Sequence, residues 1–345
     1  MNFCSDNTTG AAPEVMAALE AANVGPAMPY GADDLTARVE GRFQEVFETD
    51  AAIFMVGTGT AANSLCLSVM APPYGAVFCH PESHIMNDEC GAPEFFTGGA
   101  KLMPLPDHGG KITAADLSEA IDQPDHGVHA VQAACVSLTQ SSEAGTLYSL
   151  DEIRAIADVA HGHGLTVHMD GARFANAIVG RGCTPAETTW KAGVDVLSFG
   201  ATKNGAWAAE AIVAFDPGLA DSLGFRRKRG GHLFSKMRFV AAQLDGYLAG
   251  GAWLRLAAHA NAMAARLADG LAGVPGASFR HPIEANELFV ALPEAVIQGL
   301  EADGFTFYRW IGETATLLRL VTSFATRQED IDAFIASARS HAMAA

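Results

Sequence analysis

Two neighbouring apolar runs in the middle of the chain each end in side chains that could do chemistry together. Asp170 and Arg173 lie in the tetrapeptide Asp-Gly-Ala-Arg at the end of the first run, and Lys203 lies just past the second, 33 residues after Asp170. An Asp at a strand's end can pair with a protonated pyridine nitrogen, so that the ring accepts electrons, and an Arg three residues later can reach a phenolate oxygen. A lysine among small residues beside a buried strand can be deprotonated by desolvation and attack a carbonyl. A turn-capping Asp170 and a solvated Lys203 are the ordinary alternatives for each segment alone, but the spacing favours a Schiff-base lysine and an electron-accepting ring cofactor.

A third segment, Val56-Gly57-Thr58-Gly59-Thr60, follows a predicted strand and opens a predicted helix. The backbone N–H groups and threonine hydroxyls at such a positive helix end can hold a phosphate. With the following Ala61 and Ala62, the segment also satisfies the dinucleotide pattern G-x-G-x-x-A, which would indicate an oxidoreductase. A tight turn with no ligand is the third interpretation, and this segment alone leaves all three open.

Composition excludes several classes of partner. The chain has 345 residues, a formal net charge of -17 and a pI near 5.0, which argue against binding to nucleic acid or to an anionic membrane surface. The six cysteines are scattered without a C-x-x-C pair, so neither a disulfide framework nor a metal site is predicted, and a reducing cytoplasm is expected. We find no targeting segment and no apolar run of 18 residues. A small-molecule ligand fits this composition.

The elements that must position these side chains follow an alternating pattern. Short apolar runs alternate with amphipathic helical runs, which predicts parallel strands joined by crossover helices in an α/β fold. One such helix begins at Ser149, where Glu152 completes a predicted capping box. Ligands bind at the carboxyl ends of strands in open α/β sheets, where Asp170 is expected. The candidate strands are residues 51–56, 76–80, 131–138, 165–170, 194–199 and 211–215.

The length exceeds what one hydrophobic core usually organises, so we expect more than one unit. After about residue 240 the composition shifts to an Ala- and Leu-rich helix at 253–271, followed by strand-like pieces at 287–292 and 316–322. We predict an N-terminal segment (1–30) that contributes to the active site, a large cofactor-binding domain (31–240) and a small C-terminal domain (241–345).

The order of these motifs resembles the L-threonine aldolase family. The segments T-G-T-x-x-N, S-H, D-G-A-R, S-x-x-x-x-K and a late R-L-V-T-S occur in the family's order, from Ser5 to about Phe334. The resemblance implies the aspartate-aminotransferase-like fold of pyridoxal-phosphate (PLP) fold type I, with a mostly parallel seven-stranded sheet and a small C-terminal α+β domain. It also implies retro-aldol cleavage of L-threonine, L-allo-threonine and phenylserine to glycine and an aldehyde. The expected assembly is a homotetramer, a dimer of dimers with shared active sites.

The same resemblance implies a role for each matching residue. Gly59 and Thr60 would hold the phosphate, and His84 would stack on the pyridine ring. The other implied cofactor contacts are Asp170 to the ring nitrogen, Arg173 to the phenolate side and Lys203 to the aldehyde, while Ser5, Tyr30, Arg173 and Arg319 would contact the substrate.

Two segments depart from the family pattern. Many members have an Asn-Thr-His segment where this chain has Leu138-Thr-Gln-Ser-Ser-Glu-Ala-Gly145, so a histidine near the substrate hydroxyl is absent and the threo or erythro preference stays open. From its place beside the ring in the family pattern, we predict that His84, directly or through a water, removes the β-hydroxyl proton. The basic run at residues 225–231 is expected to offer one cation to a neighbouring subunit's phosphate.

Three other functions remain open at this stage. A PLP-dependent β-eliminating lyase would share Lys203, Asp170 and Arg173 and differ only in its products. A nicotinamide-dependent oxidoreductase would use residues 57–62 but would make the spacing of Asp170 and Lys203 a coincidence. A non-catalytic chain on the same scaffold is disfavoured by the intact residue set.

Overall fold

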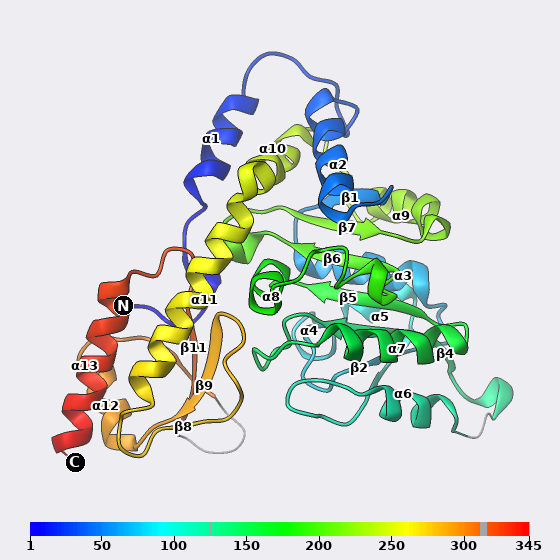
Figure 1. The fold of residues 1–345 in the computed structure, drawn as a ribbon. Helices are drawn as coiled ribbons and strands as arrows, with labels where there is room; N and C mark the ends of the chain where they lie inside the picture. Colours follow the sequence, from blue (N-terminus) through cyan, green and yellow to red (C-terminus); the bar gives the residue numbers. More distant parts are fainter. Residues whose placement is uncertain (124–125, 311–315, 345) are drawn as a thin grey trace.

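The computed structural model describes residues 1–123, 126–310 and 316–344, and these residues build two sheets and the helices around them (Figure 1). The larger sheet has the strand order β1-β7-β6-β5-β4-β2-β3. Its strands are β1 (Ala52–Val56), β2 (Gly75–Cys79), β3 (Lys101–Pro104), β4 (Gln132–Thr139), β5 (Thr166–Gly171), β6 (Val196–Gly200) and β7 (Glu210–Ala214).

Strand direction in the larger sheet explains where a ligand can bind. β2, β3, β4, β5 and β6 pair in parallel, and β7 is antiparallel to both of its neighbours, β6 and β1. Every strand except β7 therefore points the same way, and their carboxyl ends share one edge of the sheet. Segments that follow β1, β2, β4, β5 and β6 in the sequence meet at that edge, together with the start of β7.

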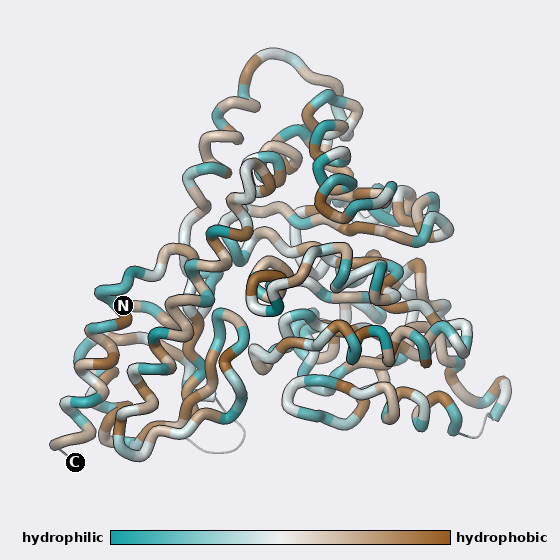
Figure 2. Tube along the Cα trace, in the orientation of Figure 1, coloured by the Kyte–Doolittle hydropathy of each residue, from teal (hydrophilic) through white to brown (hydrophobic). Residues whose placement is uncertain are grey.

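Helices cover both faces of the larger sheet, which is why its strands are almost continuously apolar. One buried core lies between the sheet and α2, α6, α7, α8 and α10, and a second lies between the other face and α3, α5 and α9. Figure 2 shows hydrophobic segments gathered in the strands, with alternating colours along the outer helices. These helices are α2 (Asp34–Phe47), α3 (Gly59–Met70), α4 (His84–Asn87), α5 (Ala92–Thr97), α6 (Ala114–Ile121), α7 (Leu150–Gly162), α8 (Phe174–Arg181), α9 (Pro217–Arg229) and α10 (Arg238–Leu248).

The smaller sheet has its own core. Its order is β10-β11-β9-β8, and the core between this sheet and α11, α12 and α13 includes Phe334 and, from the chain's start, Phe3. Asn2 forms a bridge with Thr306. The elements are β8 (Ser278–Phe279), β9 (Glu287–Ala291), β10 (Tyr308–Arg309), β11 (Leu317–Val321), α11 (Ala252–Leu271), α12 (Glu294–Ala302) and α13 (Gln328–Ala344).

The N-terminal segment links the two sheets. After Phe3 it forms a short 3-10 helix, η1 (Asp6–Thr8), and α1 (Pro13–Ala22), which packs on α10. The predicted domain divisions at residues 30 and 240 stay predictions. The remaining 3-10 turns are η2 (Gly127–His129), η3 (Trp190–Ala192), η4 (Thr202–Asn204) and η5 (Ala249–Gly251).

The predicted elements correspond closely to the observed ones. Each predicted strand overlaps an observed one, and the capping box is present, with Ser149 Oγ accepting from Glu152 N at 3.2 Å and Glu152 Oε2 accepting from Ser149 N at 2.7 Å. The strand β3 was not predicted from the sequence. It is short, lies at the edge of the sheet and ends in Pro104, a residue with no N–H to donate to a ladder. Within the described residues, no helix is long and apolar enough to cross a membrane.

Candidate functional site

A cavity of about 340 Å³ opens at the carboxyl edge of the larger sheet. The loop after β1, the end of β5 and the turn after β6 bring Gly59, Thr60, Asp170 and Lys203 to its wall. Gly59 and Lys203 are 144 positions apart in the sequence, yet both line this one cavity. His84, from the start of α4 after β2, completes the group.

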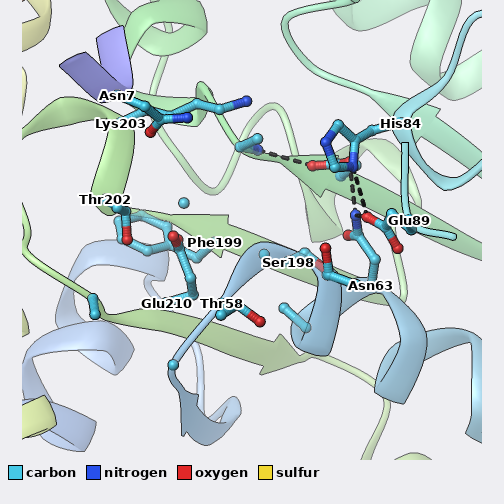
Figure 3. Close-up of a pocket in the computed structure, with 18 of the residues that line it drawn as sticks. Asn7, Thr58, Asn63, His84, Glu89, Ser198, Phe199, Thr202, Lys203 and Glu210 are labelled. Carbon is cyan, nitrogen blue, oxygen red and sulfur yellow. Dashed lines mark hydrogen bonds and ion pairs between the residues drawn. The ribbon is translucent and has the colours of Figure 1, made fainter. Parts of the chain in front are cut away.

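Lys203 lies in η4, just beyond β6. Figure 3 shows its side chain reaching across the cavity toward the side where His84 and Glu89 lie. The turn is anchored by Asn204, whose Nδ2 donates to Tyr247 Oη at 2.7 Å and to Trp253 O at 2.8 Å. Gly205 follows at φ 122°, and a Cβ there would lie 2.9 Å from the Cβ of Ala12, so a larger residue would displace the turn that carries Lys203.

Asp170 ends β5 with a buried carboxylate that faces the cavity. Its Oδ2 accepts from Asn63 Nδ2 at 2.9 Å, and its Oδ1 accepts from Ala172 N at 3.0 Å. These two donors fix the orientation of the carboxylate. Each oxygen keeps lone-pair capacity for one more donor, so the group can still accept a proton-bearing ring nitrogen.

The helix α3 points its first turn at the same cavity. Thr58 is the N-cap, with Oγ1 accepting from Ala61 N at 3.1 Å, and Gly57, Gly59 and Thr60 line the wall. The unpaired N–H groups and the dipole of this 12-residue helix make its start suitable for an anion. Among the described residues that line this cavity there is no arginine.

His84 is held by a buried carboxylate that the sequence analysis did not single out. His84 Nδ1 lies 2.8 Å from Glu89 Oε1, and the same oxygen accepts from Asn63 Nδ2 at 2.9 Å. The hydrogen bond to Glu89 raises the pKa of His84 and so favours the imidazolium. Because Asn63 also donates to Asp170, a continuous hydrogen-bonded path joins His84 to the acid at the end of β5.

A second chamber of about 490 Å³ adjoins the first. Asn7, His84 and Lys203 line both spaces, so the lysine lies at their boundary. Residues of the N-terminal segment and of the smaller sheet close the second chamber. Its other lining residues are Ser5, Asp88, Glu143, Arg173, Tyr308, Arg309, Trp310 and Arg319.

Arg173 lines this second chamber and not the first. Its Nε and Nη2 bind Asp6 at 2.8 and 3.2 Å, and its Nη1 lies 3.4 Å from Glu287 Oε2. Every nitrogen of the guanidinium therefore has a carboxylate of its own chain beside it. Its predicted contacts with the cofactor and the substrate stay predictions.

The predicted carboxylate-binding residues also lie at the second chamber. Arg319 Nε is hydrogen-bonded to Glu287 Oε1, and its Nη1 lies 3.4 Å from Cys4 O. Ser5 caps η1, with its Oγ accepting from Asn7 N at 3.2 Å. The ion pair with Glu287 fixes the orientation of the Arg319 guanidinium. Arg319 is partly exposed and lines the chamber.

Tyr30 lies away from both spaces of its own chain. It is half exposed, has a positive φ of 58°, and its ring lies beneath Lys228, whose Nζ is 4.4 Å from the ring centroid. The prediction that it lines a site therefore depends on a second subunit.

Glu143 and Glu210 reach the site without any local sequence signal. Glu210 starts β7, and its carboxylate accepts from Ala201 N at 2.7 Å, while burial raises the pKa of Glu210 to about 7. Burial also raises the pKa of Glu143, with Lys203 and Arg173 opposing the shift. Only tertiary packing determines this burial, so spacing alone could not have revealed it.

Comparisons with known proteins show the family of the chain. The model of the beta-eliminating lyase family matches residues 2–294. The chain belongs to this family. It is 44% identical over 339 residues to a low specificity L-threonine aldolase of Pseudomonas sp. (strain NCIMB 10558), covering 98% of this chain and 97% of the relative. It is 47% identical over 312 residues to the Pseudomonas aeruginosa protein of the same name, covering 90% of each.

A solved structure of the family superposes on nearly the whole molecule. The Leishmania major threonine aldolase matches with a TM-score of 0.91 and 27% identity, covering 99% of each chain. The sequence-based resemblance to L-threonine aldolases and the predicted α/β fold of PLP type I are both confirmed.

Proposed function

We propose that this chain is an aldehyde-lyase that uses pyridoxal 5'-phosphate to cleave L-β-hydroxy-α-amino acids to glycine and an aldehyde. The substrates proposed are L-threonine, L-allo-threonine and phenylserine. The observation that carries the proposal is the meeting of Lys203, Asp170 and the start of α3 in one cavity beside a chamber that contains Arg319. The names of the Pseudomonas relatives support the same reaction.

The residues present fit the proposed cofactor. The cavity offers an amine for the aldehyde, a buried carboxylate with lone pairs left for a ring nitrogen, and a helix start for the phosphate. His84 is proposed to pack on the ring. When bound, the cofactor supplies a conjugated, electron-accepting ring that stabilises negative charge at the substrate's Cα.

The chain's own residues then orient the substrate. Ser5 and Arg319 are proposed to bind its carboxylate, which would turn the Cα–Cβ bond perpendicular to the ring and so select the bond that breaks. Lys203, which lines both spaces, is proposed to give a proton to Cα and release glycine. Asn63 orients the Asp170 carboxylate by donating to it.

A homo-oligomer with shared active sites would explain two features of the single chain. The phosphate end of the cavity has no arginine from the described residues of its own chain, and Tyr30 and the basic run at 225–231 lie outside the site. We propose that the chain forms a dimer of dimers. In it, the basic run of a second copy brings one cation to the phosphate. The six free cysteines are compatible with a cytoplasmic location.

The test is a product analysis. Purified protein loaded with the cofactor is incubated with L-allo-threonine, and glycine plus acetaldehyde is the expected pair. Ammonia plus a keto acid would instead identify the β-eliminating lyase. A nicotinamide-dependent oxidoreductase would give neither pair and would change nicotinamide absorbance at 340 nm.

A further inference from the structure

One acid in the second chamber has no assigned role. Glu143 is partly buried, lines the chamber with His84, Lys203 and Arg173, and makes no hydrogen bond or ion pair with the part of the chain that the structure describes. It lies near enough to Lys203 and Arg173 for both to affect its charge. Glu143 therefore lines the chamber that is proposed to hold the substrate, beside the amine of Lys203.

The loop that carries Glu143 is fixed by its neighbours. Ser142 N donates to Thr146 O at 3.0 Å, and Thr146 Oγ1 donates to Gly109 O at 2.8 Å. Gly145 has a φ of 76°, and a Cβ there would lie 2.8 Å from Glu287 O in the smaller sheet. These contacts hold the loop against β9, so the acid is preorganised at the chamber wall.

His84, the base predicted from the sequence, already has another proposed role. One of its ring nitrogens is bound to the buried Glu89 carboxylate, which stabilises the protonated ring. Glu89 and the proposed packing on the cofactor ring therefore give His84 two partners, whereas Glu143 has none among the described residues. Desolvation raises the proton affinity of Glu143 above that of an exposed glutamate, which makes its ionised form the better acceptor.

We propose that Glu143 is the catalytic residue that accepts the β-hydroxyl proton of the substrate. This inference rests on the proposed function and names a residue for it. A Glu143 oxygen takes the proton from the hydroxyl, the O–H electron pair forms the aldehyde C=O, and the Cα–Cβ bond breaks with its pair left at Cα. Lys203 then protonates Cα, and the Glu143 proton leaves through the open chamber to water.

The experiment compares two reactions of one variant, Glu143→Gln. Cleavage of L-allo-threonine needs removal of the hydroxyl proton, whereas exchange of the glycine α-hydrogen with deuterium does not, because glycine has no hydroxyl. We expect E143Q to lose cleavage by about 10²- to 10⁴-fold, the usual effect of removing a general base. The rate of glycine exchange and the cofactor absorbance should stay within about threefold of the parent. The thermal midpoint should stay within a few degrees of the parent.

Glu119→Gln is the matched control, because Glu119 is an exposed acid on α6 away from both spaces. E119Q should leave both reactions unchanged. If E143Q does not fold, Glu143→Ala with added acetate replaces it, and acetate should restore cleavage without affecting exchange.

Three results would overturn the inference: cleavage by E143Q near that of the parent, a proportional loss of cleavage and exchange, or absence of acetate rescue in E143A. Failure of the parent protein to form glycine and an aldehyde would instead refute the proposed function. The two failures are therefore distinguishable.

Discussion

At the scale of single residues, the carboxylate of Asp170 is the group on which the cofactor chemistry most depends. Asn63 donates to it at 2.9 Å and also donates to Glu89, which in turn holds His84. The amide therefore positions two acids that would face different parts of the same ring.

Replacing Asp170 by Asn tests the charge of this group while keeping its size. A neutral amide cannot stabilise a protonated ring nitrogen, so we expect cleavage to fall on the order of a hundredfold and cofactor affinity to weaken. Steady-state kinetics with saturating cofactor and an absorbance titration measure the two effects. Asp34→Asn, at an exposed position, should change neither, and full activity in D170N would contradict the assignment.

Sequence reasoning identified some of these residues and not others. Lys203 and Asp170 follow apolar strands, and the rule that ligands bind at carboxyl ends of strands predicted that they meet. Glu89, Glu143 and Glu287 carried no such signal, because a glutamate is normally solvated and only long-range packing buries these three.

At the scale of elements, an ion pair ties the N-terminal segment to the larger sheet. Asp6 and Arg173 are both buried, with contacts at 2.8 and 3.2 Å, and Asn286 Nδ2 also donates to Asp6 at 3.1 Å. The attraction to Arg173 lowers the pKa of Asp6 against the effect of burial, which raises it. Loss of either partner would remove the main counter-charge of the other, since Arg173 would keep only the longer contact of its Nη1 with Glu287, at 3.4 Å.

Asp6→Ala should therefore destabilise the protein by about 3 to 5 kcal/mol. Urea unfolding of the variant and the parent measures the difference. Asp332→Ala is the matched control, since it removes an exposed pair with Arg266 and should cost no more than about 1 kcal/mol. Equal costs for the two variants would show that burial of the Asp6 pair has no special effect.

A polar path crosses the middle of the larger sheet through β4, β5 and β6. His168 Nδ1 lies 2.8 Å from Ser137 Oγ, and its Nε2 lies 2.9 Å from Ser198 Oγ. Burial lowers the pKa of His168 to about 4, so the ring is neutral in the folded protein at neutral pH. These bonds link three central strands directly beneath the site.

This buried histidine predicts a pH dependence of stability. The unfolded chain takes up a proton below about pH 6.5, but the folded ring does so only near pH 4, so stability falls across that window by up to about 3 kcal/mol. Above pH 6.5 the group contributes no pH dependence. His168→Gln, which keeps hydrogen-bonding groups but does not titrate, should flatten the curve of unfolding free energy between pH 7 and pH 4.5, and parallel curves would contradict the prediction.

The central strands of the larger sheet were easier to predict from the sequence than its edge strand β3. Buried strands such as β5 and β6 have apolar runs that indicate their position, while β3 is short and pairs on one side only. The antiparallel direction of β7 could not be derived from its sequence, because an apolar run has the same pattern in either direction.

At the scale of the whole molecule, the site lies where the larger sheet, the smaller sheet and the N-terminal segment meet. Lys203 comes from the first, Arg319 from the second and Ser5 from the third. A ligand that contacts the larger sheet and its neighbours should stabilise the folded arrangement as a whole. This coupling follows because the unfolded chain has no assembled site.

Removing the cofactor should therefore lower thermal stability. At a free cofactor concentration of 100 times Kd, binding contributes about 2.7 kcal/mol, which corresponds to several degrees in thermal midpoint. Differential scanning calorimetry of protein stripped with phenylhydrazine, before and after adding the cofactor back, measures the change. Lys203→Ala should show a smaller gain, and identical midpoints with and without cofactor in the parent would contradict the account.

The most direct test of the central claim is to trap the cofactor on its lysine. Borohydride reduction of the coloured protein, followed by proteolysis and mass spectrometry, should find the pyridoxyl group on the peptide that contains Lys203, and Lys203→Ala should give no labelled peptide. A label on any other lysine, or a parent protein that stays colourless with added cofactor, would contradict the account.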